Sequence, residues 1–176
     1  MVRYYQALTF PAYLQTEAYA RSLIRYGAPW LTPDEVPERA AERAAYGEKL
    51  TGSRTPVLWT VVDETVLWRR YGSTAIMREQ LAHIVNLVDR ERLTIQLVPA
   101  QSHRHPGNSG SFTIITGEGP EVVYAEIVNK GQTITAASEV ARYRLLFGSL
   151  QGTALGPDET LTVLRNELKR IDDEQG

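Results

Sequence analysis

The segment from Thr74 to Asp89 constrains the fold most, because it carries an amphipathic helix signal between two runs that are typical of buried strands. Its apolar residues recur at helical spacing and would share one face of a helix; they are Ile76, Met77, Leu81, Ile84, Val85 and Val88. Residues 57–62 before it and 93–98 after it are short runs rich in β-branched and other apolar side chains, a composition that strands favour. The chain is therefore predicted to combine helices with a sheet.

Two further helices are predicted ahead of these elements. Thr16 is suited to cap a helix that continues to about residue 26, and Gly27 is suited to end it. Thr32 and Glu35 have the spacing of a capping box. This spacing predicts a second helix that runs to about residue 50 and is ended by Gly52.

The second half of the chain predicts a hairpin followed by two helices. Residues 111–116 and 122–127 are expected to be antiparallel strands, and residues 137–150 a helix. Pro157 is suited to open a last helix, whose narrow apolar stripe consists of Leu161, Leu164, Leu168 and Ile171. Such a stripe either packs on the rest of the domain or pairs with another chain to form a homodimer; we expect packing on the domain.

Together these elements predict an α+β fold. We expect a single domain over residues 1–176, with a mixed or antiparallel sheet of about four strands covered by helices. A chain of 176 residues is long enough for one well-filled core. Its 43% apolar and 23% charged residues are typical of a globular chain rather than a disordered one.

Charge and cysteine content narrow the possible partners and chemistry. The net charge is −2, from 19 basic and 21 acidic residues, whereas domains that bind phosphate backbones usually carry a basic excess. Direct binding of nucleic acid is therefore disfavoured. The absence of cysteine excludes disulfides, thiolate nucleophiles and cysteine-bound metals. No stretch has the pattern of a signal peptide or a membrane span, so we expect a cytoplasmic protein that does not bind membranes.

Glu64 and Glu126 are the first candidates for acid–base chemistry, because both lie at the ends of predicted strands, where side chains are delivered to a cleft. Two carboxylates in one cavity can act as acid and base if burial separates their pKa values. The alternative is that each forms a structural ion pair with an arginine. The arginines closest in sequence to Glu64 are Arg69, Arg70 and Arg78.

His103 and His105 lie in a long polar loop, residues 100–110, and are suited to supply a general base or part of a metal site. The alternative is a solvated loop with no chemical role. No carboxylate lies within several residues to complete a ligand set, and the usual phosphate, hydrolase, zinc and calcium motifs are absent. No metal and no cofactor are therefore predicted. Long loops nevertheless form the rims of sites more often than short ones.

Three aromatic residues near the predicted sheet and one arginine are candidates for ligand binding: Trp59, Trp68, Tyr124 and Arg78. Aromatic side chains supply large apolar contact areas with a polar tip, which suits a small-molecule pocket. The alternative is that these aromatic residues are anchors of the core or of an interface.

Several stretches together resemble the C-terminal domain of actinobacterial XRE-type, antitoxin-like helix-turn-helix regulators. They cover nearly the whole chain in order and comprise residues 13–21, 62–67, 77–81, 95–99, 111–113, 123–126 and 154–159. The most specific part is the cluster formed by Leu14-Gln15-Thr16 and Tyr19-Ala20-Arg21. Two places depart from the family pattern. Pro11-Ala12-Tyr13 stands where the family has Pro-Gly, and an Arg-Gln pair is replaced near Tyr46-Gly47.

This resemblance implies a role in transcription regulation, often beside a small partner protein, and it implies no catalytic residues. The first hypothesis is therefore a sensing domain that binds a small molecule or a small regulatory protein at the sheet edge and the loop 100–110. The helix-turn-helix of the family has no counterpart in these 176 residues, so a DNA-binding domain is expected to be absent, and the sequence is either a fragment of a regulator or a stand-alone copy of its C-terminal domain.

The second hypothesis is a stand-alone, cofactor-free enzyme of specialised metabolism, recruited from the regulator fold. It would be a cyclase, isomerase or hydrolase that holds its substrate in an enclosed aromatic pocket. Its acid–base groups would be Glu64, Glu126, His103 and His105.

Overall fold

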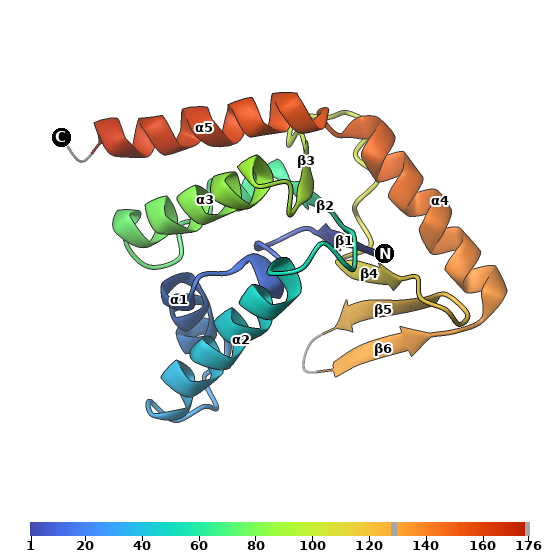
Figure 1. Ribbon diagram of the computed structural model, residues 1–176, viewed down its shortest axis with the longest axis horizontal. Helices are drawn as coiled ribbons and strands as arrows, with labels where there is room; N and C mark the ends of the chain where they lie inside the picture. Colours follow the sequence, from blue (N-terminus) through green and yellow to red (C-terminus); the bar gives the residue numbers. More distant parts are fainter. Residues whose placement is uncertain (128–129, 175–176) are drawn as a thin grey trace.

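A mixed β-sheet organises the chain, with helices on both of its faces (Figure 1). The computed structural model describes residues 1–127 and 130–174. In chain order the strands are β1 (Val2–Gln6), β2 (Leu58–Asp63), β3 (Thr94–Val98), β4 (Phe112–Ile115), β5 (Val122–Ile127) and β6 (Lys130–Ile134). The helices are α1 (Glu17–Gly27), α2 (Glu35–Thr51), α3 (Thr74–Asp89), α4 (Ala137–Thr153) and α5 (Pro157–Asp173), with short 3₁₀ turns η1 (Ala12–Leu14) and η2 (Glu64–Leu67).

The six strands lie in the order β3-β2-β1-β4-β5-β6. The β1–β2 and β2–β3 pairs are parallel, and the β1–β4, β4–β5 and β5–β6 pairs are antiparallel. The predicted α+β class and mixed sheet are confirmed. The predicted number of about four strands is wrong, because β1 and β6 also belong to the sheet.

Strand β1 escaped prediction because it lies in the middle of the sheet and lacks the alternating pattern of a half-exposed strand. Tyr5 and Gln6 are both buried although they point to opposite faces. Strand β6 is polar and forms an edge of the sheet, so it carries none of the apolar periodicity that predicts strands.

Two apolar cores lie on the two faces of the sheet. One face packs against α1, α3 and α5 through residues that include Val62, Met77, Leu81, Leu97 and Leu164. The opposite face packs against α4 through residues that include Tyr5, Val61, Phe112, Val140 and Phe147. Because α4 alone covers that second face, the layers are unequal, as Figure 1 shows.

Local signals place the helix starts well, with one exception. The hydroxyl of Thr16 accepts a hydrogen bond from the Tyr19 backbone N–H at 3.4 Å, which confirms its capping role. Helix α3 has the bounds predicted from its apolar spacing. Helix α2, however, starts at Glu35 rather than next to Thr32, because the Glu35 carboxylate accepts both the backbone N–H and the hydroxyl of Thr32 at 2.8 Å and holds that residue in the preceding turn.

The segment between α4 and α5 covers the edge of the sheet at β3. The backbone N–H of Leu155 donates to the carbonyl of Leu97 at 2.8 Å, and the N–H of Leu97 donates to the hydroxyl of Thr160 at 3.1 Å. Leu164 and Ile171 are fully buried against the core. The apolar stripe of the last helix therefore packs on the domain.

Across the described residues, none of the helices has both the length and the apolar character needed to span a bilayer.

Candidate functional site

The carboxyl ends of β1, β2, β3 and β5 meet at the same edge of the sheet, because these four strands run in the same direction. The amino end of β4 lies among them, and the loop 99–111 enters β4 there. Clefts in sheets of this kind form outside the carboxyl ends of parallel strands. The polar residues gathered at this edge are Gln6, Asp63, Glu64, His105 and Glu126.

A pocket of about 220 Å³ opens on the face of the sheet that α2 covers in part. Its floor is formed by residues that stand side by side across three strands: Tyr4 pairs with Thr113, and Thr113 pairs with Tyr124. The walls come from η1 and from Tyr46 on α2, and Gln6 and Glu126 lie at the strand ends. We refer to this cavity as the tyrosine pocket; its lining residues are Tyr4, Gln6, Pro11, Ala12, Tyr13, Tyr46, Thr113, Ile115, Tyr124 and Glu126.

Four tyrosines give the pocket its chemical character. The rings of Tyr4 and Tyr13 lie with their centroids 4.6 Å apart, and the Tyr13 and Thr60 hydroxyls are 2.5 Å apart. Burial raises the pKa of Tyr4 and of Tyr13 well above the ordinary value, so both phenols stay neutral. Tyr46 and Tyr124 are 55% and 40% exposed, which leaves their rings free to contact a ligand at the mouth.

Two separate side-chain hydrogen bonds lie at and beside the polar end of the pocket. The Gln6 side-chain amide donates to one carboxylate oxygen of Glu126 at 2.9 Å. Arg43 donates a hydrogen bond to the side-chain oxygen of Gln15 at 3.0 Å. Burial lowers the pKa of Arg43, and the negative charge of Glu126 opposes this change. The Glu126 carboxylate is thus held in place while its residue stays exposed. A carboxylate placed in this way can accept hydrogen bonds from a ligand.

Gly47 on α2 allows the wall of the pocket to form. A Cβ atom at this position would overlap the backbone oxygen of Tyr13. A glycine is therefore required for α2 to pack closely against η1, and this packing brings Tyr46 next to Tyr13.

The loop that carries the two predicted histidines is pinned to the opposite face of the sheet. The N–H of Gly107 donates to Nδ1 of His105 at 3.0 Å, so the ring proton lies on Nε2, which is 2.9 Å from Oδ2 of Asp63 but off the line of a good hydrogen bond. The Tyr5 hydroxyl donates to the Gly107 carbonyl at 3.2 Å, and burial raises the pKa of Tyr5 to about 12. His103 is exposed in the same loop.

The structure separates the four acid–base candidates. Glu126 lines the tyrosine pocket, whereas Glu64, His103 and His105 do not. Glu64 accepts the backbone N–H of Ala100 at 2.9 Å and so holds the start of the histidine loop.

Two of the three arginines near Glu64, Arg70 and Arg78, have other partners. Arg70 pairs with Glu174 at 2.9 Å, and Arg78 pairs with Asp172 at 2.5 Å. Both of these acidic partners lie at the C-terminal end of α5. The carboxylate of Glu64 is therefore engaged by the backbone instead of by a guanidinium group.

The four predicted ligand-binding residues also lie apart. Tyr124 is part of the tyrosine pocket. The indole N–H of Trp59 donates to Gln96 at 2.9 Å on the α4 face. Trp68 is 59% exposed after η2, and Arg78 lies on the outer side of α3.

Sequence reasoning missed the other lining residues that carry polar or aromatic groups: Tyr4, Gln6, Tyr13, Tyr46 and Thr113. One signal for two of them is present. Tyr4 and Gln6 have the same two-residue spacing as Tyr124 and Glu126, which puts each pair on one face of its strand. The register that sets these pairs on the same face could not be read from either segment alone.

Within residues 1–127 and 130–174, no group of three or more histidine, aspartate or glutamate side chains is arranged to hold a metal ion.

Comparison with known proteins identifies the family. The family described as "Domain of unknown function (DUF5753)" matches residues 1–166, and the chain therefore belongs to this family. No curated protein and no solved structure matched the chain.

Proposed function

We propose that this chain is the sensing domain of a transcription regulator and that it binds a small organic molecule in the tyrosine pocket. The ligand class is set by the lining: an apolar body with a ring, and a positively charged or hydrogen-bond-donating group that meets Glu126. Tyrosine rings accept both apolar groups and cations on their faces.

The observation that carries this proposal is the convergence of four tyrosines on one fixed carboxylate. The rings come from β1, η1, α2 and β5, and the carboxylate of Glu126 lies beside Gln6 at the strand ends. Small-molecule sites are typically concave, largely apolar, and equipped with a few placed polar groups. The pocket, at about 220 Å³, suits a small molecule better than a protein segment.

The resemblance to XRE-type regulators supports the regulatory part of the proposal. Both places where this sequence departs from the pattern of those regulators, Pro11-Ala12-Tyr13 and Tyr46-Gly47, border the pocket. Related sensors that bind different ligands are expected to differ in the residues of the ligand site and to share the surrounding fold. A ligand there would contact α2 and the sheet together, so its binding would change how the α1–α2 pair rests on the sheet.

The proposal is tested with phenethylamine as a probe, because it combines one aromatic ring with one ammonium group. We expect amide NMR shifts at Tyr4, Gln6, Thr113, Tyr124 and Glu126. Glu126→Gln should weaken binding by roughly ten- to a hundredfold, the magnitude of a charge-assisted hydrogen bond. The neutral 2-phenylethanol should bind more weakly to the native chain and lose little in the variant.

Tyr46→Ala and Tyr26→Ala form a matched pair for the aromatic wall. Tyr26 is 74% exposed on α1 and is not a lining residue, so its removal should leave binding unchanged. Equal losses in both variants, or shifts that avoid the pocket residues, would exclude the tyrosine pocket as the ligand site.

A second candidate function rests on Glu126 as well. As the one predicted acid–base residue that lines the pocket, it would act as the base of a cofactor-free enzyme that holds its substrate among the tyrosines. Glu126→Gln separates the two functions: a sensor loses affinity for its ligand, whereas an enzyme keeps substrate binding and loses turnover.

A further inference from the structure

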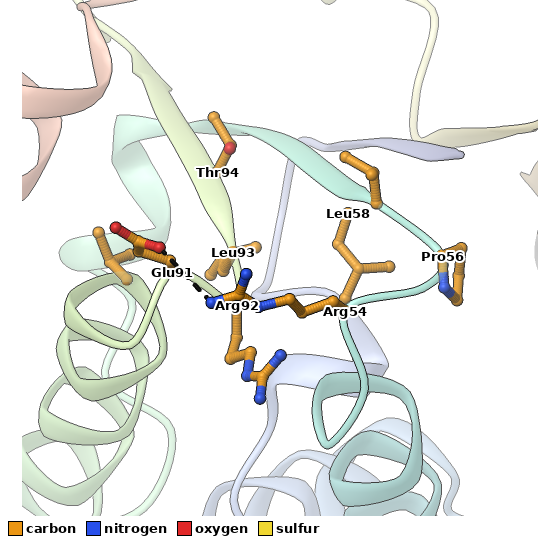
Figure 2. Close-up of a pocket in the computed structure, with 9 residues that line it drawn as sticks. Arg54, Pro56, Leu58, Glu91, Arg92, Leu93 and Thr94 are labelled. Atoms are coloured by element: carbon orange, nitrogen blue, oxygen red, sulfur yellow. Dashed lines mark ion pairs between the residues drawn. The ribbon is translucent and has the colours of Figure 1, made fainter.

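A second cavity lies at the opposite edge of the sheet, where the amino ends of β2 and β3 meet. It has a volume of about 340 Å³. Figure 2 shows that it is formed by the segment that leads into β2 and by the turn between α3 and β3; the lining residues are Arg54, Pro56, Val57, Leu58, Val88, Glu91, Arg92, Leu93 and Thr94. None of these residues lines the tyrosine pocket, so we name this cavity the arginine cavity.

One part of the arginine cavity is apolar. Its apolar side chains come from the start of β2 and from the end of α3, and they are Val57, Leu58, Val88 and Leu93. Val57 is 51% exposed although its side chain is apolar. Leu58 and Leu93 belong to the buried core, so the hydrated apolar surface comes from Val57 and the partly buried Val88. Water in contact with these two side chains would be released by a ligand with a short apolar portion, which favours binding.

The other part carries two guanidinium groups whose positive charges are only weakly neutralised by nearby carboxylates. The side chain of Arg54 extends towards Glu91 (Figure 2), but the two charged groups are 4.0 Å apart and the side chains are 80% and 84% exposed. Solvent weakens such a pair to a small fraction of its strength in a buried setting. Arg54 is therefore available to another anion.

Of the two arginines, Arg92 has fewer interactions that neutralise its charge. In the part of the chain that the structure describes, no carboxylate forms an ion pair with it. Its Nη1 atom is enclosed and has no hydrogen-bond partner. Arg92 as a whole is only partly buried and lines the cavity, so its other N–H groups are the ones that can donate to an anion there.

We propose that the arginine cavity binds a small molecule that carries a carboxylate or phosphate group and a short apolar portion. The anionic oxygens would bridge Arg54 and Arg92, because guanidinium groups match the geometry of carboxylate and phosphate. The apolar portion would lie against Val57 and Val88. Glu91 competes for Arg54 and would be displaced on binding. This site is independent of the tyrosine pocket and of its proposed ligand.

The proposal is tested by amide NMR titration of the native chain with three probes: hexanoate, hexyl phosphate and the neutral hexanamide. We expect shifts at Arg54, Val57 and residues 91–94, without shifts at Tyr124 or Glu126. At least one of the two anions should bind ten times more tightly than hexanamide, and the tighter anion identifies the group that the cavity prefers.

Three variants and one control sharpen the test. Arg92→Gln and Arg54→Gln should each weaken anion binding at least tenfold, and Glu91→Gln should strengthen it at least twofold because the competing carboxylate is gone. Arg142→Gln, an exposed arginine on α4, should change nothing. If Arg92→Gln fails to fold, the highly exposed Arg54 still provides the test.

Equal affinities for hexanamide and both anions would overturn the proposal. It would also fail if the shifts fall outside the lining residues, or if Arg54→Gln binds the anions as the native chain does. None of these results bears on phenethylamine in the tyrosine pocket, so the two proposals stand or fall separately.

Discussion

The ring of Tyr124 lies over the backbone of Gly131 on the neighbouring strand. A Cβ atom at Gly131 would overlap Cζ and Oη of Tyr124. In the β5–β6 ladder Tyr124 pairs with Thr133 and Gly131 pairs with Glu126, so the ring crosses the ladder diagonally. Aromatic side chains cover glycines on adjacent strands in this way. The glycine therefore sets the position of one part of the floor of the tyrosine pocket.

Gly131→Val should displace the Tyr124 ring and lower the free energy of unfolding by about 1–3 kcal/mol, the usual cost of adding bulk where none fits. Phenethylamine binding should weaken with it. In a urea-unfolding cycle, the valine should cost much less in a Tyr124→Ala background, because the overlapping ring is gone. Additive effects of the two substitutions would show that the contact has no energetic role.

Gln80 is expected to be a principal structural residue of the domain. It is fully buried on α3; its carbonyl accepts the N–H of Thr16 at 2.8 Å and its amide donates to the carbonyl of Leu14 at 2.6 Å. Gln80→Leu keeps the volume but leaves two backbone groups without partners, so the free energy of unfolding should fall by roughly 2–4 kcal/mol. Gln132→Leu, on the exposed edge strand, should cost less than about 0.5 kcal/mol in the same urea experiment.

His83 should make stability depend on pH below neutrality. Burial lowers its pKa from the ordinary 6.5, and the carboxylates of Glu48 and Glu79 only partly oppose this. The unfolded chain therefore takes up a proton at a higher pH than the folded chain, so the stabilising contribution is complete above about 6.5 and declines as the pH falls below that value. His83→Gln removes this decline.

Urea unfolding of both proteins at pH 7.5 and pH 5 measures the effect. The native chain should lose more free energy of unfolding between the two conditions than the variant does. Equal losses would mean that His83 titrates alike in the folded and unfolded chain.

Thr160→Val tests the closure of the sheet edge at β3. Thr160 and Leu97 are both fully buried, and the threonine hydroxyl accepts the N–H of Leu97 at 3.1 Å. Valine has the same shape without an acceptor, so we expect a loss of about 1–3 kcal/mol in the free energy of unfolding. Thr162→Val on the exposed side of the same helix is the control; a loss as large as that of Thr160→Val would assign the effect to helix propensity.

Local sequence signals predict the elements whose pattern of apolar residues can be recognised without knowing which other segments they pack against. Helix α3 is fully determined by its apolar spacing, and β5 by a short apolar run. Strand β1 could not be found in this way, because both of its faces are covered by distant segments. The edge strand β6 could not be found because residues 131–133 are exposed and Ile134 is its one apolar residue, which gives no alternating pattern.

The site was accessible to sequence reasoning only in part. Tyr124 and Glu126 follow the two-residue alternation of one strand, so the sequence places them on one face. That Tyr4 and Gln6 join them depends on the β1–β4–β5 register, and that Tyr46 joins them depends on the close packing of Gly47 against Tyr13. Neither the strand register nor this packing contact can be recognised from the local sequence.

Strand β1 precedes all the other strands in the chain, yet its two neighbours are β2, more than fifty residues later, and β4, more than one hundred residues later. The centre of the sheet therefore cannot close until most of the chain has been synthesised, and pairing over such separations is slow. Removing β1 would therefore divide the sheet into β3-β2 and β4-β5-β6 instead of shortening it at one edge.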